Sequence, residues 1–137
     1  LTDMKKIPRG IRNNNPLNIR KSNTQWIGKL SHNTDGTFEQ FDTMEHGIRA
    51  GFIILRTYIR KYNLRSIHKI IYRWAPPKEN NTVAYIKTVC QRSGIEPDRE
   101  LFFLDAKKMI KIVEAMIFVE CGTAISEEVI RKAYPSD

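Results

Sequence analysis

The spacing of apolar residues changes after residue 42, and this change limits the fold more than any other feature. Residues 9–41 hold Asn-Pro and Asp-Gly turn signals, and only short apolar pieces lie between them, around Trp26, Ile27, Phe38 and Phe41. These pieces predict two or three small strands. We therefore expect a small β-hairpin region near the N-terminus.

From residue 43 onward, apolar residues recur at intervals of three and four, which is the period of amphipathic helices. Asp42 and Glu45 form a capping-box signature at the start of this part. The predicted helices cover about 43–62, a shorter segment from Ser66 to the "APP" at 75–77, about 81–93, about 106–121, and a last short segment that opens at Ser126. The expected core face of the third helix is Val83, Ile86, Val89 and Cys90. The predicted fold class is mainly α (α+β), and residues 1–137 are expected to form a single domain.

Positive charge is concentrated in the first half of the chain. The net charge is +8, and residues 1–74 carry 14 Lys and Arg against 5 Asp and Glu. Nucleic acid, acidic glycans and the anionic bacterial wall all fit this charge. Nucleic acid is disfavoured as a partner, because the sequence has neither a recognition-helix motif nor interleaved aromatic residues. The first long helix carries a basic stripe, for which a solvated face is favoured over a binding surface: Arg49, Arg56 and Arg60.

We predict no metal and no cofactor. The three histidines, His32, His46 and His68, are scattered, and no Cys/His cluster has zinc spacing. Cys90 and Cys121 lie among apolar residues, which favours free thiols and leaves a single disulfide open.

No apolar run reaches the length of about 18 residues that a membrane span needs. The N-terminal "LTDMKKIPRG" also lacks the apolar stretch of a secretory signal. Because the chain begins with Leu rather than Met, a leader that has been removed would not be visible. The compartment therefore stays open.

One carboxylate, Glu120 in "VEAMIFVECG", interrupts an apolar helix face. At about 100° per residue, Glu120 falls between Val113 and Met116, at the centre of the stripe. Two interpretations stay open: the helix end frays at Gly122 or an arginine pairs with the carboxylate, or the carboxylate is functional. A carboxyl group against apolar walls at the edge of a cleft has a pKa raised toward neutrality, as a general acid of a glycosidase requires.

The loop "RNNNPLN" contains four asparagines that donate and accept hydrogen bonds without charge, as sugar hydroxyls and N-acetyl groups require. Two aromatic residues further along the chain offer stacking surfaces for sugar rings. The predicted glycan-binding residues are Asn13, Asn14, Asn15, Asn18, Trp26 and Tyr85. Asparagine also favours turns, and taken alone the loop favours that interpretation.

Several segments together resemble a known family. "RGIRNNNPLNIR", "GTFEQFDTMEHGIRA", "IIYRWAPPKENNTVAYI" and "AMIFVECG", within residues 8–122, are similar to phage and bacterial proteins of the lysozyme-like, lytic-transglycosylase type, often filed as virion structural proteins. The resemblance implies a lysozyme-like helical domain. In that group a catalytic Glu ends a helix that precedes the small β region. Here the corresponding helix comes last, so we infer a circular permutation in which Glu120 occupies the catalytic position.

The resemblance implies cleavage of the peptidoglycan glycan strand between N-acetylmuramic acid and N-acetylglucosamine. Glu120 would protonate the glycosidic oxygen, and the nucleophile would be water, as in a muramidase, or the 6-hydroxyl of the sugar, as in a lytic transglycosylase. The only nearby-looking second carboxylates are Glu39 and Asp42, which slightly favours the single-carboxylate route.

The chain departs from the family pattern at Leu17 and Cys121, which supports an alternative. In that alternative the protein is a non-catalytic virion structural or cell-wall-binding protein with the same fold. The expected partners are peptidoglycan or a related glycan and other virion proteins. The expected location is a phage virion or the bacterial cell envelope or periplasm.

Overall fold

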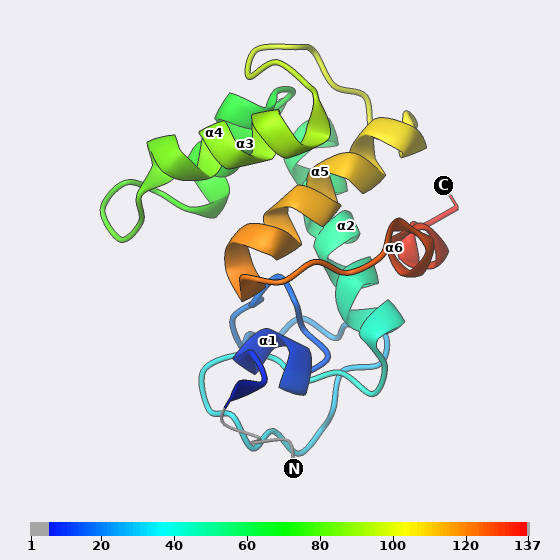
Figure 1. Cartoon of the computed structure of the whole chain (residues 1–137). Helices are drawn as coiled ribbons and strands as arrows, with labels where there is room; N and C mark the ends of the chain where they lie inside the picture. The colour runs from blue at the N-terminus through cyan, green and yellow to red at the C-terminus, as the bar shows by residue number, and fades with distance from the viewer. Residues whose placement is uncertain (1–5, 137) are drawn as a thin grey trace.

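The computed structural model describes residues 6–136, and helices dominate this part of the chain (Figure 1). The first two helices are α1 (Arg9–Arg12) and the long α2 (Met44–Arg60). The others follow in order as α3 (Ile67–Trp74), α4 (Thr82–Ser93), α5 (Ala106–Cys121) and α6 (Glu127–Ala133). None of the helices within residues 6–136 has both the length and the apolar character to cross a membrane.

The predicted helices are confirmed, and their ends follow from capping side chains. Ser66, Asn81, Asp105 and Ser126 each accept a hydrogen bond from a backbone N–H in the first turn of the helix that follows. Gly94 and Gly122 end α4 and α5 in the left-handed conformation.

The cap of α2 differs from the prediction. Thr43 caps this helix by accepting from the N–H of His46, whereas Asp42 bonds to the imidazole of His46. The predicted capping box of Asp42 and Glu45 is therefore wrong by one residue.

The predicted small β-hairpin region near the N-terminus is wrong. Residues 6–43 contain only two isolated antiparallel bridges, Arg20 with Phe38 and Lys29 with Phe41, and the described residues form no sheet. Asparagine side chains occupy the backbone groups that a ladder would use: Asn15 bonds to Ile19 and Glu39, Asn14 to the carbonyl of Phe41, and Asn33 to the carbonyl of Phe38. Local side-chain bonds of this kind compete with strand pairing.

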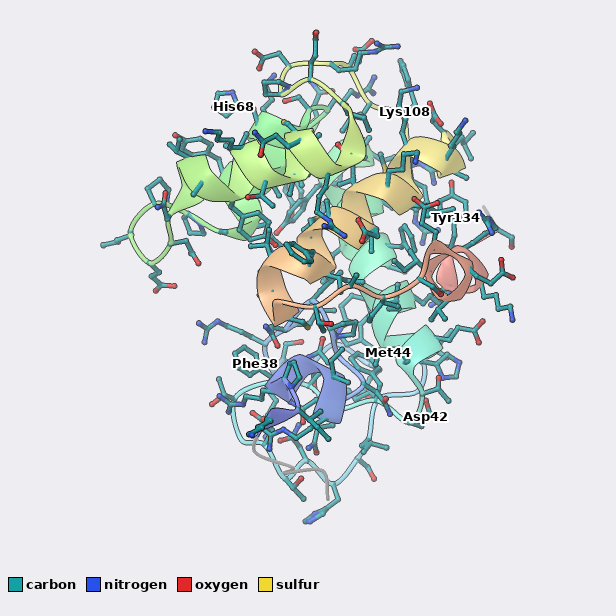
Figure 2. All side chains as sticks on the ribbon, viewed as in Figure 1. Phe38, Asp42, Met44, His68, Lys108 and Tyr134 are labelled. Atoms are coloured by element: carbon teal, nitrogen blue, oxygen red, sulfur yellow. The ribbon has the colours of Figure 1, made fainter. Side chains whose placement is uncertain are left out.

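The core lies between the helices of residues 44–133. Fully buried side chains come from α2 to α6 and the 101–103 segment, and the largest include Ile48, Phe52, Leu55, Ile67, Ile70, Ile71, Leu101, Met109, Ile112 and Met116. Tyr134, which is labelled in Figure 2, follows α6. It packs on the rings of Phe52 and Phe103 and donates to the carbonyl of Phe103. This contact joins the C-terminal end of the chain to α2.

The predicted core face of α4 is partly wrong. Val83 is 69% exposed, whereas Thr82 and Tyr85 are buried. The hydroxyl of Thr82 donates to the carbonyl of Ala75, and Tyr85 reaches α5, so polar contacts set the rotation of α4. The prediction from hydrophobicity alone therefore placed the wrong residue, Val83, in the core at the start of α4.

Two glycines let α2 touch the asparagine-rich loop. A Cβ at Gly47 would lie 1.8 Å from the carbonyl oxygen of Asn14, and one at Gly51 would lie 2.2 Å from the side chain of Leu17. The loop backbone therefore rests directly on the helix, which fixes the position of residues 14–18.

We expect Gly47→Ala to lower the free energy of unfolding by about 3 kcal/mol, because the added methyl group meets a backbone carbonyl that cannot move without the loop. Chemical denaturation followed by circular dichroism measures this loss. The control is Glu45→Ala on the exposed side of the same helix, with an expected change of about 0.5 kcal/mol or less. Equal effects of the two substitutions would contradict the close contact.

Candidate functional site

Glu120 lies one residue before the end of α5 and is half-buried. The two stripe residues beside it, Val113 and Met116, are fully buried, so Glu120 faces inward as its spacing predicted. The helix continues through Cys121, so fraying does not explain the carboxylate. Among the described residues no Lys or Arg forms an ion pair with it, so an arginine partner does not explain it either.

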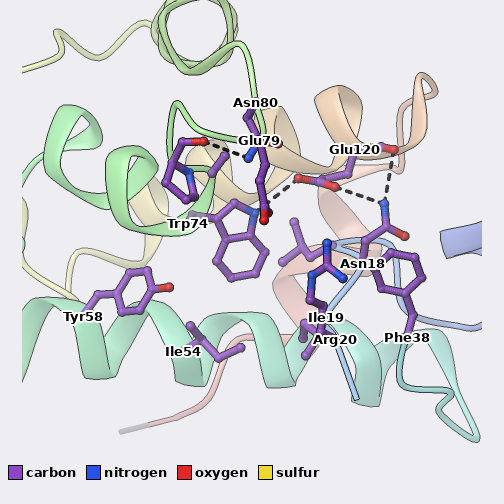
Figure 3. A pocket seen from close by; sticks show the side chains of 13 residues that line it. Asn18, Ile19, Arg20, Phe38, Ile54, Tyr58, Trp74, Glu79, Asn80 and Glu120 are labelled. Carbon is purple, nitrogen blue, oxygen red and sulfur yellow. Dashed lines mark hydrogen bonds between the residues drawn. The ribbon is translucent and has the colours of Figure 1, made fainter. Parts of the chain in front are cut away.

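Three neutral donors hold the Glu120 carboxylate, and Figure 3 shows two of them, Asn18 and Trp74. The amide Nδ2 of Asn18 lies 3.0 Å from Oε1, while the hydroxyl of Tyr85 and the indole Nε1 of Trp74 lie 2.9 Å and 3.3 Å from Oε2. These donors come from the asparagine-rich loop, α4 and the end of α3. The carboxylate therefore connects three separate segments at one point.

Tyr85 is only 6% exposed, and its hydroxyl stays protonated near neutral pH. Burial first, and then the negative charge of Glu120 and the hydrogen bond to it, raise the pKa of Tyr85 well above its usual range. The phenol oxygen can also accept a hydrogen bond, so Tyr85 can remain bonded to Glu120 whether or not the carboxyl group carries a proton.

A groove extends to both sides of Glu120. One hollow of about 390 Å³ lies between the loop with Asn18 and Arg20 and the segment from Trp74 to Asn80 (Figure 3). A second hollow of about 320 Å³ lies along α4, beside Tyr85 and Thr88. Glu120 and Asn80 line both hollows, so the carboxylate lies where the two meet.

Of the predicted glycan-binding residues, the structure brings Asn18 and Tyr85 to Glu120. The side chains of Asn13, Asn14 and Asn15 bond within the loop region, to Asp35 and Gln40, to Phe41, and to Ile19 and Glu39. Trp26 lines neither hollow. The loop therefore contributes one asparagine to the groove, and the others hold its shape.

Sequence reasoning missed most of the opposite wall of the groove. Trp74, Glu79 and Asn80 all line it, and they come from the "RWAPPKEN" segment. The sequence of this segment did indicate a site, because polar residues flank two prolines between two helices. In such a turn the side chains of the two helix ends come close together.

The two carboxylates that the sequence offered as partners for Glu120 do not line the groove. Glu39 is 0% exposed and pairs with Lys29 at 3.1 Å, while Asp42 bonds to His46. Glu79 is the second carboxylate of the larger hollow.

Cys121 follows Glu120 directly but does not offer a nucleophile. Cys90 and Cys121 are both free cysteines. The thiol of Cys121 donates to the carbonyl of Pro16 at 3.1 Å, and burial, with a smaller effect of the Glu120 charge, raises its pKa to about 11. Since the thiolate is the nucleophilic form, Cys121 is inert near neutral pH.

The fold and the site define a helical protein with one half-buried carboxylate at the junction of two hollows. No family model matches the chain. It is 45% identical over 125 residues to protein P5 of Pseudoalteromonas phage PM2, an alignment that covers 89% of this chain and 76% of the phage protein. The chain therefore belongs to the family of this phage protein.

The raised pKa of Cys121 gives a test of the charge on Glu120. In a Cys90→Ser background, iodoacetamide should alkylate Cys121 slowly at neutral pH and faster as the pH approaches 11. Glu120→Gln should move this rise to lower pH, because the neighbouring negative charge is gone. Mass spectrometry of the alkylated fraction gives the rates, and an unchanged profile in Glu120→Gln would refute the electrostatic contact.

Proposed function

We propose that the protein cleaves the glycan strand of bacterial peptidoglycan, with Glu120 as the general acid and then the general base. The observation that carries the proposal is the position of Glu120 at the junction of two hollows, held by three donors. A carboxylate of a glycosidase must lie midway along a site that binds sugars on both sides of the bond it breaks.

The lining of the groove suits an uncharged, ring-shaped substrate. Asn18, Asn80 and Asn81 supply amide donors and acceptors, and Tyr58 and Trp74 supply aromatic surface in the larger hollow. Sugar hydroxyls and N-acetyl groups need such amides, and sugar rings stack on such aromatic faces. These contacts support a glycan as the substrate.

In the proposed reaction, the protonated Glu120 gives its proton to the glycosidic oxygen as the bond to the anomeric carbon breaks. The proton of the incoming nucleophile is then accepted by the Glu120 carboxylate or by a second base. Trp74, Tyr85 and Asn18 orient the carboxyl group throughout, because each comes from a different wall of the groove. The reaction needs no metal.

The contact between Asn18 and Glu120 supports the proposed permutation of a lysozyme-like fold. The two residues are 102 positions apart in the sequence, and the thiol of Cys121 also reaches the carbonyl of Pro16. The loop and the end of α5 thus adjoin in space, as they would if the catalytic helix preceded the loop in an unpermuted chain. The phage relative supports a place in a phage virion.

Glu120→Gln should lower the rate of release of soluble fragments from purified bacterial walls by about 10²–10⁴-fold, because the amide cannot donate or accept the proton. Turbidity and analysis of the released muropeptides measure this rate. The matched control, Glu96→Gln, alters an exposed glutamate outside both hollows and should act as wild type. Equal, measurable activity of wild type and Glu120→Gln would remove Glu120 from the mechanism, and no release of fragments by either protein would favour the non-catalytic wall-binding protein.

Tyr85→Phe should lower the same rate by about 10- to 100-fold and leave binding to the walls unchanged. The substitution keeps the ring and removes a hydrogen bond to a charged group, which typically contributes about 1.5–3 kcal/mol. Sedimentation of the protein with the walls measures binding separately from cleavage. A loss of binding without a loss of rate would contradict the role of Tyr85 in orienting Glu120.

A further inference from the structure

The larger hollow contains a second carboxylate, on Glu79, that sequence reasoning did not assign. Figure 3 shows its side chain extending into the groove on the side of Trp74. Glu79 is exposed, and no described residue pairs with its carboxylate. Glu39, Glu114, Glu127 and Glu128, in contrast, each pair with a Lys or Arg.

The turn that carries Glu79 is anchored at both ends. The buried hydroxyl of Thr82 donates to the carbonyl of Ala75, and Asn80 and the N–H of Glu79 both donate to the carbonyl of Pro76. Asn81 caps α4 at the far end of the turn. The turn thus holds Glu79 between the two helix ends that supply Trp74 and Tyr85, the residues that bond to Glu120.

We infer that Glu79, in place of Glu120, is the general base that activates water, so that the cleavage is a hydrolysis. This inference rests on the proposed function. Two carboxylates that face one groove can divide the work, one on the leaving oxygen and one on a water molecule at the opposite face of the sugar. Glu120 is held in a fixed orientation at the junction of the two hollows, which suits the group that must meet the glycosidic oxygen, whereas the exposed carboxylate of Glu79 is open to water.

The proposed hydrolysis consumes one water molecule for each glycosidic bond that breaks. Water attacks the anomeric carbon and loses one proton to the carboxylate of Glu79, while the bond from that carbon to the glycosidic oxygen breaks. The electron pair of the broken bond stays on the glycosidic oxygen, which takes the proton of Glu120. The products are a free reducing end and a free 4-hydroxyl group, with a net gain of one water molecule.

The experiment digests purified bacterial walls in oxygen-18 water with the full chain as wild type, Glu79→Gln and Glu120→Gln. We expect wild-type products to carry oxygen-18 at their reducing ends, and Glu79→Gln to form these ends about 100-fold more slowly with unchanged binding to the walls. Glu100→Gln, an exposed loop glutamate outside the groove, is the matched control and should equal wild type. Mass spectrometry of the released fragments separates labelled reducing ends from anhydro ends.

Azide gives a second readout that a structural role of Glu79 would not produce. In Glu79→Ala, azide needs no base and should restore cleavage with a glycosyl azide as the product. Anhydro ends from wild type, or equal rates for Glu79→Gln and wild type, would overturn the role of Glu79 while the loss in Glu120→Gln preserves the proposed function. Equal rates for Glu120→Gln and wild type would overturn both.

Discussion

The hydrogen bonds to the Glu120 carboxylate are the constraint on which the arrangement of the groove depends. They join the asparagine-rich loop, the end of α3 and the first turns of α4 to the end of α5. A half-buried carboxylate is costly to desolvate, so it needs donors, and each donor has to be brought to it by a separate segment. The walls of the groove are therefore positioned by the same polar contacts that hold the candidate catalytic group.

The helices could be predicted because local signals and the apolar period agree. Ser66, Asp105 and Ser126 begin helices, Gly94 and Gly122 end them, and the apolar stripe of α5 is buried as expected. Glu120 was visible for the same reason, since a single acid in a long apolar stripe contradicts its surroundings. A regular apolar period identifies both the residues that form the buried stripe and the one residue, Glu120, that interrupts it.

The N-terminal third could not be predicted in the same way. Its short apolar pieces look like strands, but Asn14, Asn15 and Asn33 bond to the backbone groups that strands would share. Whether an amide side chain bonds to its own loop or waits for a ligand depends on contacts 20 or more residues away, such as those of Asn15 with Glu39. Spacing alone does not contain that information, so the roles of Asn13, Asn15 and Asn18 looked identical in the sequence.

Glu79 and Trp74 were missed for a related reason. Trp74 ends α3 and Glu79 lies in the turn that follows it. The role of this turn depends on its neighbours in space, because it connects the two helix ends that contact Glu120. A glutamate in a polar, proline-containing turn is unremarkable as sequence, because most such residues are solvated. Only the position of α5 across the turn makes it part of a groove.

The distribution of charge in the groove argues for a glycan over a nucleic acid, despite the basic first half of the chain. Arg9 and Lys29 are paired with Asp35 and Glu39, so part of that positive charge is neutralised within the loop region. The larger hollow holds one cation, Arg20, against the two carboxylates of Glu79 and Glu120. A phosphate backbone gains affinity by replacing counterions with Lys and Arg, and a lining of this composition would repel it. A polymer of sugars with N-acetyl groups brings no phosphate charge to the two acids, and its hydroxyls match the amides that surround them.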